Sequence, residues 1–174
     1  MKKFWPLILA GLLLVVGLFL FVPRSTDIDM EVEAMEYSLG DAAYAVPHTI
    51  VIQGTYTKQV IGETKFQGTL AISGIESTQP PNQANAIFSG PRAYVHYLGF
   101  SSDGRSSFLF SNELIELYAT SDFSQFSFKL FETTEDGDTF SASWDEKTGR
   151  FLAYPAQTRE EAVALLDQFE TKRP

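Results

Sequence analysis

"HTIVIQGTYTKQVIGETKFQGTLAISGI", residues 48–75, alternates apolar and polar side chains on both sides of a central turn-like segment. Residues of equal parity point to the same face of a strand, so this two-residue period predicts two strands with one buried face each. A hairpin centred near Ile61 brings the two apolar faces together on one side. This register pairs Tyr56 with Phe66, Gly54 with Gly68, and Ile52 with Leu70.

Two facing glycines interrupt the apolar face of this hairpin, because neither Gly54 nor Gly68 carries a side chain. A glycine within a strand often marks a bend or the close approach of another group. We expect a large aromatic side chain to fill the depression, and Trp144 is the candidate. A ligand lying over the two glycines is the alternative.

Further strands are predicted on the C-terminal side of this hairpin. IESTQPPNQAN (75–85) has the composition of a polar loop, and ELIELYAT (113–120) and FLAY (151–154) have that of strands. A second hairpin is expected to join PRAYVHYLGF (91–100) to RSSFLFS (105–111) through a turn containing Gly104.

SQFSFKLFETTEDGDTFSASW (124–144) predicts a third hairpin, whose apolar residues are mostly even-numbered. A three-residue loop, Glu135-Asp136-Gly137, keeps those residues on one face, because it pairs Leu130 with Ala142 and Phe128 with Trp144. A two-residue loop at Asp136-Gly137 would pair even with odd positions and divide the core between the two faces.

The C-terminal stretch QTREEAVALLDQFETKRP (157–174) predicts an amphipathic helix over residues 158–171. Thr158 and Glu161 have the spacing of a capping box. One apolar face is expected to consist of Ala162, Leu165, Leu166 and Phe169. The fold class is therefore mainly β: an antiparallel meander of about eight strands, curled or barrel-like, with one C-terminal helix over an open face or end.

Residues 4–22 (FWPLILAGLLLVVGLFLFV) contain no charged side chain. As a helix this run is about 28 Å long, close to the thickness of a bilayer core, which predicts a transmembrane helix that contacts lipid. Lys2 and Lys3 precede it, so residues 1–3 are expected to be a cytoplasmic tip. Bulky residues and Pro23 follow the run, where a signal peptidase prefers small residues. We therefore expect an uncleaved, single-pass signal anchor; a cleaved leader is the alternative.

Residues 23–47 are interpreted as an acidic stalk or entry segment between the anchor and an extracytoplasmic domain at 48–174. Acidic and apolar residues alternate over 27–33, which favours a strand, and a helix would stack like charges. A solvated linker is the simplest alternative, and the sequence leaves helix, strand and disorder open. The predicted location is the cell membrane, with the C-terminal domain outside the cytoplasm.

The composition excludes several kinds of function. The chain carries 13 basic and 22 acidic residues, for a formal net charge of −9, and Lys2 and Lys3 belong to the cytoplasmic tip. An acidic surface repels nucleic acid and anionic lipid headgroups. The chain has no cysteine, which excludes disulfides, thiolate nucleophiles and cysteine-ligated metals. A cysteine-free exported domain indicates a bacterial origin.

No motif in the sequence predicts a catalytic residue, a cofactor site or a metal site. His48 and His96 are the only histidines and are far apart, and the acidic turn ETTEDGD (132–138) does not match a calcium loop. No nucleophile elbow or phosphate-binding loop occurs. The candidate interaction surface is an aromatic set on one predicted strand: Tyr94, His96, Tyr97 and Phe100.

These observations predict a non-catalytic accessory or regulatory interaction module of the bacterial envelope, which binds an envelope protein through a sheet edge or face. The alternative is a domain that holds a small apolar or lipid-like ligand between the sheet and the helix. An enzyme is the weakest hypothesis. A cleft in which His48 or His96 met Ser and Asp side chains would favour it.

Overall fold

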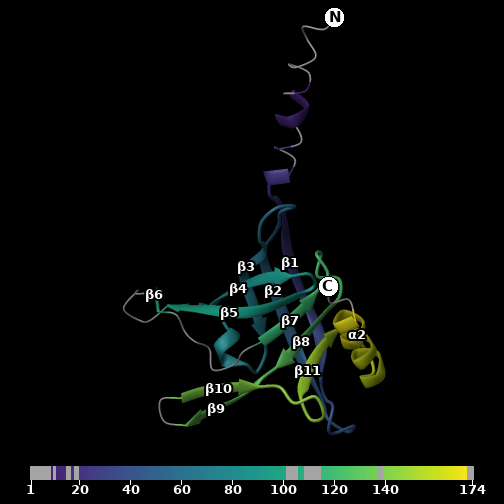
Figure 1. Ribbon diagram of the computed structural model, residues 1–174. Coiled ribbons are helices and arrows are strands. Elements are labelled where there is room, and N and C mark those ends of the chain that lie inside the picture. The colour runs from purple at the N-terminus through teal and green to yellow at the C-terminus, as the bar shows by residue number, and fades with distance from the viewer. Residues whose placement is uncertain are drawn as a thin grey trace, which may run out of the picture.

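The computed structural model describes residues 9, 11–14, 17, 20–100, 106–107, 115–136 and 139–171. Figure 1 shows a β-barrel with one helix on its outer wall and a two-stranded arm projecting from one end. The strands are β1 (Arg24–Ser38), β2 (Ala45–Lys58), β3 (Thr64–Ile72), β4 (Gln83–Ser89), β5 (Arg92–Phe100), β6 (Ser106–Ser107), β7 (Ile115–Ala119), β8 (Phe126–Leu130), β9 (Glu132–Asp136), β10 (Thr139–Ser143) and β11 (Arg150–Tyr154). The helices are the short 3₁₀ helix η1 (Glu76–Thr78) and α2 (Arg159–Thr171).

Eight antiparallel strands close the barrel in the order β4-β3-β2-β1-β11-β8-β7-β5, and β5 pairs again with β4. Every pairing around the ring is antiparallel. The predicted mainly β class, the meander and the C-terminal helix are confirmed. Closure gives each of the eight strands a neighbour on both sides over part of its length; β1, for example, pairs with β11 over Met35–Ser38.

The register predicted for residues 48–75 is confirmed, including the facing glycines. The prediction that Trp144 covers those glycines is wrong. The two strands approach so closely that a Cβ on Gly54 would lie 2.3 Å from the carbonyl oxygen of Gln67. Trp144 packs instead against the hydrophobic cluster beneath α2, where its indole N–H donates to the carbonyl of Arg150 at 2.9 Å.

Most of the segment 23–47, for which the sequence did not decide between helix, strand and linker, is the barrel strand β1. Residues 24–38 are therefore not a solvated stalk. β1 pairs with β2 over its whole length from Arg24 and with β11 at its C-terminal end. Its even-numbered side chains face the interior, while Asp27 and Asp29 lie outside and accept hydrogen bonds from Thr55 and Gln53. The barrel therefore begins before the boundary expected at residue 48.

The third hairpin does not form as predicted. β8 pairs with β7 and β11, so Leu130 lies opposite Ile115 and Arg150, and the strand ends at Leu130. Ala142 pairs with Thr133 in a separate β9–β10 arm, which has a two-residue connection outside the described residues. The buried face was assumed to continue through the whole stretch, but the arm leaves the barrel and its register is not set by the core.

Within the described residues, the predicted second hairpin appears as a short pairing of β5 with β6, and the rest of 101–111 lies outside those residues. β5 pairs mainly with β7 and with β4, a strand that the sequence analysis did not identify. The β4–β5 turn contains Gly90 at a φ of 64°, a left-handed conformation that glycine adopts at little cost.

Side chains fill the barrel interior, and the end at which β1 begins is closed by an aromatic plug. Phe123, in the β7–β8 turn, is fully buried and has a φ of 55°. Its ring lies 5.3 Å from that of Phe66, 6.0 Å from Tyr56 and 6.3 Å from Phe88, centroid to centroid. The hydrogen bonds that Asp122 accepts from the backbone N–H and the hydroxyl of Ser124 hold the turn.

Helix α2 lies on the outer wall, against β11, β8 and β7, rather than over an end of the barrel (Figure 1). Its predicted cap is present, because Thr158 Oγ1 accepts from the N–H of Glu161, and the carboxylate of Glu161 accepts from the N–H of Gln157. The buried helix residues are those predicted: Ala162, Leu165, Leu166 and Phe169.

The predicted anchor, residues 4–22, lies largely outside the described residues. Its described members are 9, 11–14, 17 and 20–22, of which all but residue 22 are helical. Among the residues that the structure describes, no helix has the length and hydropathy needed to span a bilayer. The run leads into β1 at the plugged end of the barrel (Figure 1).

Candidate functional site

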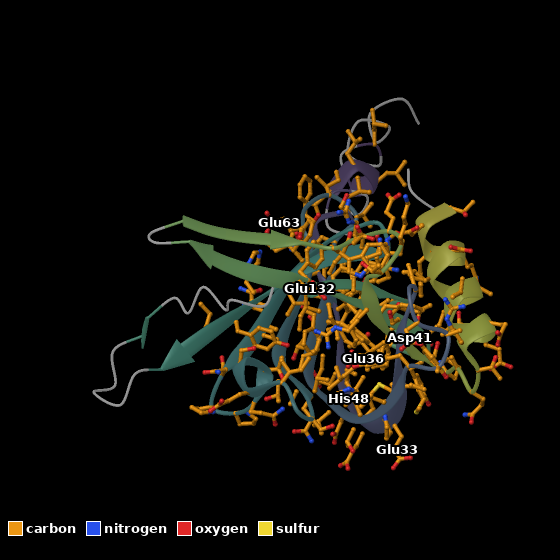
Figure 2. The ribbon with its side chains drawn as sticks, turned by 90° about the horizontal axis from the view of Figure 1, so that it is seen from below. Glu33, Glu36, Asp41, His48, Glu63 and Glu132 are labelled. Atoms are coloured by element: carbon orange, nitrogen blue, oxygen red, sulfur yellow. The ribbon has the colours of Figure 1, made fainter. Side chains whose placement is uncertain are left out.

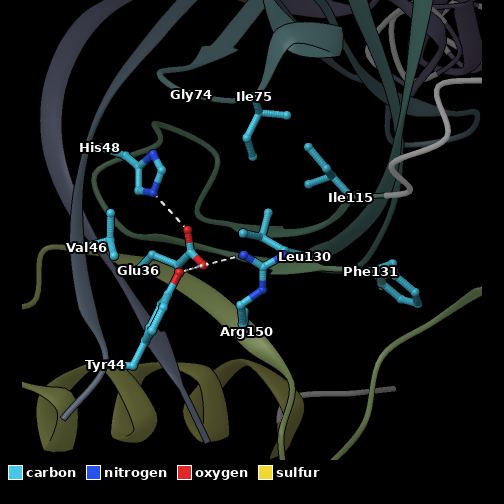
Figure 3. A pocket seen from close by; sticks show the side chains of 10 residues that line it. All are labelled: Glu36, Tyr44, Val46, His48, Gly74, Ile75, Ile115, Leu130, Phe131 and Arg150. Carbon is cyan, nitrogen blue, oxygen red and sulfur yellow. Dashed lines mark hydrogen bonds and ion pairs between the residues drawn. The ribbon is translucent and has the colours of Figure 1, made fainter. Parts of the chain in front are cut away.

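A pocket of about 270 Å³ opens at the end of the barrel opposite the aromatic plug. Figure 2 looks at the barrel from this side, and Figure 3 shows the pocket in close-up. The strand ends and loops that meet here come from distant parts of the chain. The lining residues are Glu36, Tyr44, Val46, His48, Gly74, Ile75, Ile115, Leu130, Phe131 and Arg150.

Strand register places a carboxylate between two basic side chains. Glu36 pairs with Val46 on β2 and with Leu152 on β11, so His48 and Arg150 are its diagonal neighbours on the same inner face. The inward-facing residues of β1 are thus apolar up to Ala34, and the next one, Glu36, is acidic and lies at the open end of the barrel.

Glu36 is the centre of a hydrogen-bonded cluster in this pocket, although its side chain is only 4% exposed. One carboxylate oxygen accepts from the Tyr44 hydroxyl at 2.9 Å and from the Arg150 guanidinium at 3.1 Å. The other oxygen lies 2.8 Å from Nε2 of His48 (Figure 3). A buried carboxylate is stable only with such partners, and Glu36 has three of them.

Both ring nitrogens of His48 face acceptors, because Nδ1 lies 2.5 Å from the carbonyl oxygen of Ser73. A carbonyl can only accept, so Nδ1 carries a proton. The other carboxylate oxygen of Glu36 is the partner of Nε2, so both ring nitrogens of His48 are held by hydrogen bonds.

Arg150 retains hydrogen-bonding capacity toward the pocket mouth. Its side chain is 41% exposed, and Glu36 and Tyr44 use only part of the five N–H donors of a guanidinium. Burial on its own would lower the pKa of Arg150, but the hydrogen bond with Tyr44 and the charge of Glu36 raise it overall. The guanidinium is therefore a permanent cation with donors free for an incoming acceptor.

An apolar wall faces this polar cluster across the pocket. It consists of Val46, Ile75, Ile115, Leu130 and Phe131. Among the described residues, none that lines the pocket is a serine, threonine or cysteine. Throughout the described ranges, no group of three His, Asp or Glu side chains is placed to hold a metal ion. The pocket thus places a cation, Arg150, beside an apolar surface.

The predicted aromatic surface on β5 is not one surface. Tyr94 and His96 are exposed on the outer wall. Tyr97 is buried, and its hydroxyl donates to the carbonyl of Leu70 at 2.8 Å inside the barrel. The side chain of Phe100 lies outside the described residues. Alternation along the strand places Tyr97 on the opposite face from Tyr94 and His96, so the described members of the set do not form one surface.

A second hollow, of about 540 Å³, lies between the outer wall and α2 and includes Tyr94. Lys129 is 5% exposed there and pairs with Glu170. Its Nζ lies 3.9 Å from Glu116 and 4.2 Å from the centre of the Trp144 ring. Lys129 therefore has partners on β7, on α2 and after β10. These contacts fasten the helix to the barrel, which is a structural role.

Of the polar residues in this pocket, the sequence alone singles out His48 but not Glu36, Tyr44 or Arg150. Residue parity could have placed Glu36 in the site, because Glu36 and His48 have the same even numbering as the inward-facing residues of their strands. Arg150 could not be found in this way, because its separation of 114 residues from Glu36 hides the contact. Comparisons of the chain with protein-family models, curated proteins and solved structures gave no significant match in any of the three.

Proposed function

We propose that this protein is a membrane-anchored, extracytoplasmic and non-catalytic interaction module of the bacterial envelope. In this proposal, the open end of the barrel receives an acidic group of a protein partner. The observation that carries the proposal is Arg150, a partly exposed cation with spare donors at the mouth of a pocket with an apolar wall.

The size of the pocket favours a partner chain over a separate small ligand. Pockets for small molecules commonly measure about 300–1,000 Å³. At about 270 Å³ this one suits a single side chain or a chain terminus. The barrel interior behind it is packed with side chains such as Phe128, Ile50 and Leu70, which are fully buried. An apolar ligand inside the barrel, the alternative considered from the sequence, has correspondingly less support.

The direction in which the chain enters the barrel supports a site that faces away from the membrane. The apolar run enters β1 at the plugged end, and the pocket lies at the other end. β1 has 15 residues, which corresponds to about 50 Å of strand, or about 35–40 Å of height at the usual barrel tilt. An anchor at residues 4–22 would hold the pocket at about that distance from the bilayer.

Site-specific photo-cross-linking in intact membranes tests the proposal. The full chain carries a photoreactive phenylalanine analogue at Phe131, which lines the pocket, or at Gln53, which is exposed on the outer wall. We expect one discrete protein adduct from position 131 and none from position 53. Arg150→Gln in the position-131 protein should abolish that adduct while the barrel stays folded by circular dichroism.

An adduct that persists in the Arg150→Gln protein would refute recognition through this cation. Equal adducts from positions 131 and 53 would show non-specific proximity and also contradict the proposal. If position 131 gives no protein adduct but a co-purifying small molecule reacts there, the small-ligand alternative takes its place.

A further inference from the structure

The β2–β3 turn exposes two large aliphatic side chains at the plugged end of the barrel. Val60 is 57% exposed and Ile61 is 51% exposed. Gly62, which follows them, has a φ of 137°, and the side chain of Gln59 occupies the space that a Cβ at residue 62 would need. The turn therefore presents two apolar side chains to the surroundings.

Strand register brings this turn alongside the N-terminal apolar run. Arg24, the first residue of β1, pairs with Lys58, the last residue of β2. The strands are antiparallel, so the chain beyond Lys58 continues toward the level of residues 22 and 23, from which β1 emerges. Phe21 and Val22 are 63% and 53% exposed at that level. Figure 1 shows the turn and the N-terminal segments at the same end of the barrel.

The charges around the turn are of the sign that anionic headgroups attract. Arg24 and Lys58 are exposed next to each other in the register, and Lys65 lies half-buried on the return strand. Glu63 is the acidic residue of the turn itself. The chain as a whole has a net charge of −9, whereas these four residues of the turn and its flanking strands have a net charge of +2.

We propose that the β2–β3 turn docks into the phospholipid surface from which the anchor emerges. In this arrangement, Val60 and Ile61 insert at the interface, and Arg24 and Lys58 contact the headgroup phosphates. The turn and the anchor then form two adjacent attachments that restrain the tilt of the barrel and keep the open end turned away from the membrane. This inference rests on the anchoring part of the proposed function, and its test separates the two.

The chain contains no cysteine, so single-cysteine variants can be labelled at one position each. The full chain is reconstituted in lipid nanodiscs of phosphatidylcholine and phosphatidylglycerol with an NBD fluorophore at Ile61→Cys. Leu12→Cys reports on the apolar run, and Ala42→Cys, exposed in the β1–β2 turn at the open end, is the matched control. Quenching by nitroxide-labelled lipid and the NBD emission maximum are measured for each variant.

We expect a blue-shifted emission and strong lipid quenching at positions 12 and 61, with solvent-like emission and no quenching at position 42. Quenching at position 12 alone would overturn the docking of the turn and leave the anchor standing. Quenching at position 61 alone would refute the anchor and retain the turn as a membrane contact. Solvent-like emission at both positions would refute both proposals.

Discussion

Phe123 allows a sharp test of how the plugged end is held. The residue is fully buried among three aromatic rings, and its φ of 55° is costly for any side chain with a Cβ. Phe123→Ala removes the ring and should cost about 3–5 kcal/mol of unfolding free energy. Phe123→Gly removes the same ring but also relieves the backbone, which is worth about 1 kcal/mol. The glycine variant should therefore be the more stable of the two.

Phe66 supplies the matched control, because it is equally buried in the same aromatic cluster but lies in the extended strand β3. There glycine should be less stable than alanine by about 0.5–1 kcal/mol, the ordinary order for a strand. Urea unfolding of the four variants in the full-length chain, followed by far-UV circular dichroism, measures both differences. If Phe123→Gly is less stable than Phe123→Ala, backbone strain at this turn is not what the φ angle indicates.

Three further changes test other parts of the structure. Glu36→Gln should lower the free energy of unfolding by about 3 kcal/mol or more, because His48 and Arg150 lose their shared carboxylate, while Glu33→Gln on the exposed side of β1 should change it by less than about 0.5 kcal/mol in the same urea titration. Gly68→Ala should destabilise the barrel by about 2 kcal/mol or more, since the new Cβ would lie 2.2 Å from the carbonyl oxygen of Gln53. Gly74→Ala should lower the free energy of unfolding by about 1 kcal/mol, because the nearest atom to its new Cβ, in His48, is 3.7 Å away. Thermal melts rank the two variants. Hydrogen bonds from Thr120 and Ser124 lower the pKa of Asp122 to about 2, so the ionised carboxylate stabilises the folded state above about pH 4, and this stabilisation is lost as the pH falls toward 2. Asp122→Asn should flatten the pH dependence of the urea midpoint in that window. An unchanged slope would refute the role given to Asp122.

The β2–β3 hairpin could be predicted in full because all of its information is local. Two alternating strands joined by a short turn allow few registers, and the one centred near Ile61 keeps Ile52, Tyr56, Phe66 and Leu70 on a common face. The capped helix α2 was predictable for the same reason, since its cap and its apolar face lie within a few turns of each other.

The sequence did not decide whether β1 is a strand, because one of its two neighbouring strands is close in the chain and the other is distant. β2 follows directly, but β11 is near the other end of the chain, and only the pairing with both explains why an acidic strand is stable. The β9–β10 arm was misassigned for a related reason. The parity argument assumed one continuous buried face, whereas β8 is already paired on both sides and the chain after Phe131 has to leave the barrel.

The candidate site was the hardest feature to predict. Its polar residues come from the end of β1, the following turn, the start of β2 and the start of β11. No spacing rule connects Glu36 with Arg150, and a single histidine is weak evidence for a function. The aromatic set on β5 was chosen by residue type alone, and alternation along the strand placed Tyr97 inside the barrel and Tyr94 outside.

The seam between β1 and β11 has a consequence for the order in which the protein can fold. β1 to β5 can pair in sequence as the chain emerges, but the ring stays open until β11 pairs with β1, as in Met35 with Ala153. During that time the inner face of β1 and its unpaired edge are exposed, and open edges of this kind promote aggregation. A chain synthesised or translocated from its N-terminus must therefore keep the incomplete barrel able to fold until its last strand, β11, is available. Mutations that weaken the seam should reduce the yield of native protein by more than their effect on equilibrium stability.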